Sequence, residues 1–133
     1  MASIHKEVSL SASPAAVWDV VRDVAAVHTR LAPGFVTDTV MDGPDRIVTF
    51  ADGLVAREVI VDIDETRRRL AYSVRSERLS HHNASFQVFA EGAGSRLVWI
   101  AGLLPDAAAV NVAARMKDGL VAPKRALDAL VAG

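Results

Sequence analysis

The strongest constraint on the fold is a pair of segments in residues 81–104, in which apolar and polar side chains alternate on either side of a turn at 91–94. Alternation with a period of two places each set of side chains on one face of a β-ribbon. Counting outward from the glycine-rich turn predicts that Phe86 lies opposite Trp99, with both apolar sets on the same face. A slip of one residue would bury Arg96 instead, so the pattern supports a β-hairpin in this register.

The same alternation occurs earlier in the chain and predicts further strands over residues 3–11, 35–41, 46–51, 54–63 and 70–75. After the first of these strands, Ser13 and Pro14 form a helix start. The valine spacing that follows predicts two short helices, over residues 14–22 and 24–31. Together with the hairpin, these strands predict one antiparallel sheet of roughly seven strands.

Residues 106–131 close the chain as one long amphipathic helix, with Asp106 as the expected N-cap. Gly119 and Pro123 lie inside this helix and predict a bend. A twisted sheet needs a cover on its apolar concave face, and this helix alone is long enough to provide one. The expected fold is a single α+β domain over residues 1–133. Its sheet wraps around the long C-terminal helix, two short helices follow the first strand, and a cavity lies between sheet and helix.

Composition and charge exclude several kinds of function. The net charge of -1 at pH 7 gives no electrostatic basis for nucleic-acid binding. The chain has no cysteine, which excludes disulfide bonds, thiolate chemistry and cysteine-based zinc sites. His81 and His82 are adjacent on a strand and point to opposite faces, so we expect no metal site, and no cofactor. Without a signal peptide or a bilayer-spanning apolar run, we expect a cytoplasmic protein with no stable membrane insertion.

Four segments, at residues 11–23, 57–74, 94–105 and 118–130, resemble the START-like or Bet v 1-like (SRPBCC) superfamily in its polyketide cyclase/dehydrase and lipid-transport branch. The first, SASPAAVWDVVRD, is similar to the family's opening strand–helix signature, and the third, GSRLVWIAGLLP, is similar to its tryptophan-containing strand. The resemblance implies a helix-grip fold, in which the sheet and the long helix enclose a pocket for apolar or amphipathic small molecules. Members include ligand carriers, hormone receptors and aromatic polyketide cyclases, so the resemblance implies the fold more closely than the function.

The orientation of the strand at 54–63 has two alternatives. One places Glu58 in the cavity, and the other places Arg57, Val59 and Val61 there, which apolar counting favours. The resemblance favours Glu58, because the matching glutamate points into the cavity in related hormone receptors.

Pairing Ser76 with His82 in the next hairpin would place Tyr72 opposite Phe86, with both side chains in the cavity. The bend in the closing helix predicts that the segment around Gly119 lies over the cavity. The ligand-binding residues expected on these grounds are Glu58, Ile60, Tyr72, Val74, His82, Ala84, Phe86, Trp99, Met116, Gly119 and Leu120.

Three of these residues are candidates for catalysis. A carboxylate desolvated in an apolar pocket suits a general acid or base, as expected for Glu58, although the alternative is a rim carboxylate paired with an arginine. Tyr72 is either a hydrogen-bond donor to a ligand carbonyl or an aromatic core residue. His82 is either an acid, base or donor at the pocket mouth or a solvated loop histidine. The adjoining loop at 78–80 matches one that gates the pocket in related receptors.

The sequence leaves three functions open. The first is binding of a small lipophilic or aromatic ligand between the sheet and the C-terminal helix. The second is a polyketide cyclase or dehydratase activity that transfers protons in the same cavity. The third is an interaction role with a vestigial pocket, in which the outward-facing Phe89, Val98 and Ile100 form an interface, as in a homodimer.

Overall fold

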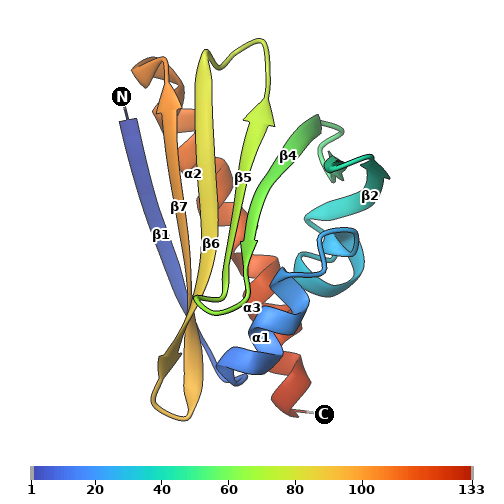
Figure 1. Ribbon diagram of the computed structural model, residues 1–133, viewed down its shortest axis with the longest axis vertical. Helices are drawn as coiled ribbons and strands as arrows, with labels where there is room; N and C mark the ends of the chain where they lie inside the picture. Colours follow the sequence, from blue (N-terminus) through green and yellow to red (C-terminus); the bar gives the residue numbers. More distant parts are fainter. Residues whose placement is uncertain (1, 133) are drawn as a thin grey trace.

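The computed structural model describes residues 2–132 and centres on a seven-stranded antiparallel sheet in the order β1-β7-β6-β5-β4-β3-β2 (Figure 1). From β2 to β7, each strand lies beside the strand that follows it in sequence, whereas β1 pairs with β7 at the far edge. The strands are β1 (Ala2–Leu10), β2 (Val36–Asp42), β3 (Asp45–Phe50), β4 (Val55–Asp64), β5 (Arg69–Arg75), β6 (His81–Glu91) and β7 (Gly94–Leu104).

The helices complete the predicted α+β helix-grip architecture. In Figure 1 the two C-terminal helices, α2 and α3, run behind the sheet along its length and cover one face of it. The helical segments are α1 (Pro14–Val21), the π-helical turn η1 (Val27–Leu31), the 3₁₀ turn η2 (Asp106–Ala108), α2 (Ala109–Gly119) and α3 (Val121–Ala132). Within residues 2–132, no helix combines the length and the apolar character needed to cross a membrane.

Helix α1 begins where the sequence predicts, because Ser13 caps it. The Ser13 hydroxyl oxygen accepts a hydrogen bond from the backbone N–H of Ala16 at 3.2 Å, and Pro14 occupies the first turn. Trp18 is buried on the inner side of the helix, and its indole N–H donates to Glu65 at 2.6 Å. This bond ties α1 to the turn between β4 and β5.

The predicted β6–β7 register and the inward orientation of Glu58 are both confirmed. Phe86 lies opposite Trp99 in the β6–β7 hairpin, as counting from the turn predicts. Glu58 lies opposite Val74 where β4 pairs with β5. The β4–β5 register shifts only after Ile60, so the irregularity leaves the orientation of Glu58 unchanged.

The predicted pairing of β5 with β6 is wrong by two residues. Tyr72 lies opposite Ala84 instead of Phe86, and the ladder ends at this pair. The expected pairing does not continue toward the loop because the ring of His82 itself accepts the next backbone N–H, that of Val74. A shift by an even number of residues keeps every side chain on its predicted face, so Tyr72 still faces the interior.

The C-terminal helix is interrupted where we expected a bend. Helix α2 ends at Gly119 and α3 begins at Val121. The buried Pro123 lies in the first turn of α3, where a missing backbone N–H is tolerated. The start of the helix differs from the prediction, because Asp106 opens a 3₁₀ turn instead of capping an α-helix.

Gly119 allows the interrupted helix to lie close against the sheet. A Cβ atom added at this position would be 3.0 Å from Trp99 Cζ3 and 3.2 Å from Phe35 Cε2, which is tighter than ordinary van der Waals contact. The rings of Trp99 and Phe35 therefore occupy the space beside Gly119.

The outer face of the sheet presents a smaller apolar patch than expected. Phe89 and Ile100 are 36% and 39% exposed, but Val98 is only 6% exposed. Val98 lies between Glu7 and Gln87, its neighbours on the two adjacent strands. Val98 is therefore not available to a partner, and an interface at this face would rest on the other two residues.

Candidate functional site

A buried ion pair lies on the inner face of the sheet. Arg46 on β3 is directly opposite Glu58 on β4, and Arg46 Nε donates a hydrogen bond to Glu58 Oε1 at 2.7 Å. The two side chains are only 3% and 10% exposed. Glu58 is therefore the residue that faces the interior, whereas Arg57 pairs at the surface with Asp42 and Asp45.

Three aromatic side chains, one from each of the next three strands, stack beside this ion pair. The Phe86 ring centroid lies 4.6 Å from that of Trp99 and 6.1 Å from that of Tyr72. The Trp99 indole N–H donates to the Tyr72 hydroxyl oxygen at 2.8 Å. The Arg46 guanidinium lies 5.4 Å from the Tyr72 ring centroid, within range of a cation–π contact. The ion pair and the aromatic stack thus form one connected group.

Tyr72 presents a hydrogen-bond donor to the interior. Burial, followed by the nearby Glu58 carboxylate, raises the pKa of Tyr72 far above its ordinary value, so the phenol stays protonated. Its oxygen already accepts the indole N–H of Trp99, and the described part of the chain supplies no acceptor for the phenol proton. A ligand oxygen beside this hydroxyl would receive that proton as a hydrogen bond.

A cavity of about 50 Å³ lies between this group and the C-terminal helices. That space suits about one or two water molecules, whereas pockets for drug-sized ligands start at about 300 Å³. Apart from three polar residues (Arg46, Glu58 and Tyr72), the lining is apolar. The other lining residues are Val27, Leu31, Ala32, Phe35, Val36, Val48, Phe50, Phe86, Trp99, Gly119 and Pro123.

One wall of the cavity is a pair of partly exposed phenylalanines. The rings of Phe35 and Phe50 meet edge to face, with their centroids 5.4 Å apart. Arg115 on α2 lies 5.1 Å from the Phe50 centroid, and its Nη2 donates to Asp52 Oδ2 at 2.8 Å. This wall therefore reaches the surface and is fastened there to the C-terminal helix.

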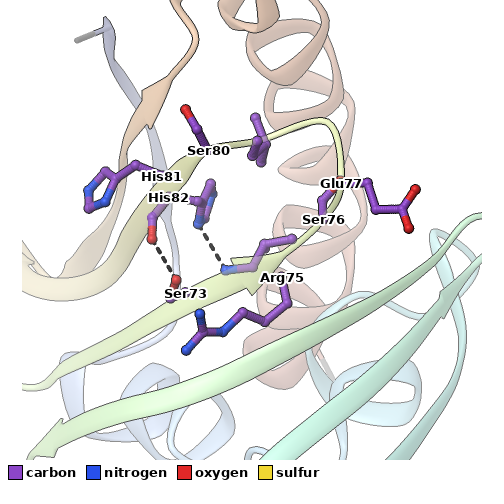
Figure 2. Close-up of a pocket in the computed structure, with 9 residues that line it drawn as sticks. Ser73, Arg75, Ser76, Glu77, Ser80, His81 and His82 are labelled. Carbon is purple, nitrogen blue, oxygen red and sulfur yellow. Dashed lines mark hydrogen bonds between the residues drawn. The ribbon is translucent and has the colours of Figure 1, made fainter.

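A second hollow lies at the end of the β5–β6 hairpin where the connecting loop joins the two strands. It is an open cleft of about 540 Å³, lined by residues 73–77 and 79–82 (Figure 2). It shares no lining residue with the interior cavity. His82 and Val74, which we expected in the interior pocket, line this cleft instead.

The backbone and the ring of His82 are both hydrogen-bonded to β5. Its Nδ1 accepts the backbone N–H of Val74 at 3.0 Å, and its carbonyl oxygen accepts the Ser73 hydroxyl (Figure 2). Burial, followed by the neighbouring His81, lowers the pKa of His82, so the ring is neutral at pH 7. Because Nδ1 is an acceptor, the ring proton is on Nε2.

The remaining expected residues divide into two groups. Those that line the interior cavity are Glu58, Tyr72, Phe86, Trp99 and Gly119. Those that pack in or against the core and line neither hollow are Ile60, Ala84, Met116 and Leu120.

Sequence reasoning missed Arg46, which contributes the only cation among the lining residues of the cavity. The sequence did indicate its orientation, because Arg46, Val48 and Phe50 are two residues apart on one strand and therefore share a face. Among residues 2–132, no three histidine, aspartate or glutamate side chains are grouped so as to hold a metal ion.

Comparison with known families decides the affiliation of the chain. The model of the polyketide cyclase / dehydrase and lipid transport family matches residues 1–132. The chain belongs to this family. The match spans the sheet and both C-terminal helices, so the interior cavity lies within the matched region. A comparison with curated protein sequences finds no match.

Solved structures share the fold at low sequence identity. The protein XoxI from Bacillus cereus has a TM-score of 0.82 at 20% identity, over 96% of this chain and 96% of its own. An uncharacterized protein from Bacillus thuringiensis has a TM-score of 0.81 at 20% identity, over 95% and 98%. Norcoclaurine synthase from Thalictrum flavum, in complex with dopamine and hydroxybenzaldehyde, has a TM-score of 0.72 at 19% identity, over 98% and 86%.

Removing either member of the buried ion pair is expected to destabilise the protein strongly. Arg46→Leu and Glu58→Leu should each lower the free energy of unfolding by about 3–5 kcal/mol, because each leaves a buried charge without its partner. Arg57→Leu is the matched control, next to Glu58 on β4. It should lower the free energy of unfolding much less, because solvent screens the ion pairs of Arg57. Urea unfolding followed by circular dichroism measures all three. Equal losses for the three variants would contradict this description of the pair.

Proposed function

We propose that the protein binds a small amphipathic molecule between the sheet and helices α2 and α3, with the polar end of the ligand near Arg46, Glu58 and Tyr72. The observation that carries the proposal is a buried ion pair on the wall of an otherwise apolar cavity. Burying two charges costs free energy, and well-packed apolar residues often stabilise a protein as well or better. A contribution to stability therefore explains poorly why an ion pair is buried here, and ligand recognition explains it better.

The polar groups suit a ligand with a carbonyl or hydroxyl group at one end. Tyr72 has a proton to donate, and Glu58 Oε2 has no hydrogen-bond partner in the described residues. The faces of Phe86 and Trp99 offer a stacking surface to an aromatic or lipophilic body. The lipid-transport description of the family supports a ligand of this kind.

An organic ligand needs more room than the cavity offers, so the proposal requires the site to open. The wall formed by Phe35 and Phe50 is the part expected to move, because both rings are partly exposed. An edge-to-face aromatic contact contributes only about 0.5–1.5 kcal/mol, which a ligand that fills the same space can replace. Moving Phe50 would also release its contact with Arg115.

Native mass spectrometry and thermal-shift screening with lipophilic and aromatic compounds test this proposal. We expect at least one compound with a carbonyl or hydroxyl group to raise the unfolding temperature and to form a one-to-one complex. Tyr72→Phe removes one hydroxyl from the cavity and should lower the affinity for that compound by about fivefold. Ser85→Ala, the matched control on β6, removes a hydroxyl that lines neither hollow and should leave the affinity for that compound unchanged. A screen without ligands, or equal binding by both variants, would reject the proposal.

A second candidate function is proton transfer on a carbonyl compound in the same cavity. Glu58 and Tyr72 both line it, so a carboxylate base and a phenol donor are available on one side. Glu58 would accept a proton from the carbon next to the carbonyl, while the Tyr72 hydroxyl stabilises the enolate oxygen. His82 lines the other hollow and takes no part. Norcoclaurine synthase shows that the fold is also used by a synthase.

Deuterium exchange of an aromatic ketone in heavy water separates catalysis from binding. If the cavity transfers protons, the protein should accelerate exchange at the carbon next to the carbonyl, as seen by proton NMR. Glu58→Gln should then remove about a hundredfold or more of the acceleration, and circular dichroism confirms that this variant is folded. Exchange that is no faster than in buffer, or that Glu58→Gln leaves intact, argues for a binding function alone.

A further inference from the structure

We propose that the cleft at the loop end of the β5–β6 hairpin is a second binding site, which takes a small carboxylate that carries a short apolar group. The proposal does not depend on the interior site, because the two hollows share no lining residue. It rests on how the hairpin is held open, on the donors left free there, and on the charge of the surrounding loop.

Two side chains hold the hairpin open where its backbone ladder ends. Continued past Tyr72 and Ala84, this register would place Ser73 opposite Asn83 and then Val74 opposite His82. The Val74 N–H is instead bonded to the His82 ring, and the His82 carbonyl oxygen accepts the Ser73 hydroxyl. Side chains thus replace a backbone rung, so the strands separate here and remain fixed (Figure 2).

The loop that closes the cleft is also anchored. The backbone N–H of Ser80 donates to the carbonyl oxygen of Leu104 at 2.9 Å, which fastens the loop to the end of β7. The backbone N–H of Arg78 donates to Ser76 Oγ at 3.2 Å, and that of Leu79 donates to the Ser76 carbonyl oxygen at 3.2 Å. The cleft is therefore bounded by bonded backbone on both sides, which is the condition for a formed binding site.

Several hydrogen-bond donors line the cleft without an acceptor. His82 as a whole is 9% exposed, and its neutral ring carries its proton on Nε2, which has no partner in the described part of the chain. The Ser76 hydroxyl accepts a bond from the loop and keeps its own proton free. The exposed Arg75 forms no ion pair with any residue between 2 and 132. Such a set of donors is suited to an oxyanion.

The charge and shape of the loop favour a carboxylate with an apolar group. Arg75 and Glu77 are the arginine and the acidic residue among the lining residues, and the Glu77 side chain extends away from His82 in Figure 2. Arg78 lies outside the lining and adds only attraction that solvent screens. Val74 and Leu79 line the cleft as well and are partly buried against the core. They offer an apolar surface next to the donors, which an inorganic anion would leave unused.

NMR titration of the ¹⁵N-labelled full chain with sodium benzoate tests the proposal. We expect saturable shifts of the backbone amides of residues 73–82, with inorganic phosphate much weaker and chloride without effect. Arg75→Gln, and His82→Asn, which keeps an acceptor for the Val74 N–H but removes the Nε2 donor, should each weaken benzoate by about fivefold. Arg78→Gln is the matched control, with the same loss of charge on the same loop but outside the lining. It should change the affinity by less than about twofold.

Three results would overturn the proposal. Shifts that do not saturate mean that the cleft holds no site. Equal effects of Arg75→Gln and Arg78→Gln mean that general charge attraction accounts for the shifts. Shifts centred on the Trp99 indole N–H mean that benzoate enters the interior cavity instead. Tyr72→Phe, which weakens ligands of the interior site, should leave benzoate binding at the cleft unchanged, so the two proposals can fail independently.

Discussion

The buried ion pair between Arg46 and Glu58 is the interaction on which the interior of this protein depends. Two neighbouring strands present opposite charges to the same face, and the pair is almost fully removed from solvent. The guanidinium also covers Tyr72, whose oxygen accepts the indole N–H of Trp99. Polar contacts therefore run across the sheet from β3 to β7 beneath the helices. Charges in such a place must be satisfied, because an unpaired one would cost several kcal/mol.

The C-terminal helix adapts to this polar and aromatic face by breaking. The Trp99 ring is held in place because it stacks on Phe86 and its indole N–H donates a hydrogen bond to the Tyr72 hydroxyl oxygen. Gly119 lies against that ring, and a Cβ atom added there would be 3.0 Å from Trp99 Cζ3, so the ring would have to shift. The helix ends there and a new helix begins one residue later. This close approach leaves a cavity of about 50 Å³, so a ligand must displace side chains in order to bind.

Local patterns predicted most of the secondary structure and only part of the site. The turn at 91–94 was sufficient to predict the β6–β7 register, because the residue pairs can be counted outward from it along two long strands. The β5–β6 register was wrong because side chains of Ser73 and His82 replace the next rung, which alternation cannot reveal. The inward orientation of Glu58 came from the family resemblance, since apolar counting favoured the opposite face. Its partner Arg46 was missed because alternation gives the face of each residue but not its partner on the next strand, and this contact depends on the β3–β4 register.

The double variant Arg46→Met, Glu58→Leu tests most directly whether the ion pair is kept for ligand recognition. Its free energy of unfolding and its binding of the fluorescent amphipathic anion 1-anilinonaphthalene-8-sulfonate would be measured beside the wild type. If the ion pair is kept for ligand recognition, the double variant should be as stable as the wild type or up to about 4 kcal/mol more stable. Its binding of the probe should fall by tenfold or more, or about 1.4 kcal/mol. A variant that is strongly destabilised and binds the probe as the wild type does would contradict this role of the pair.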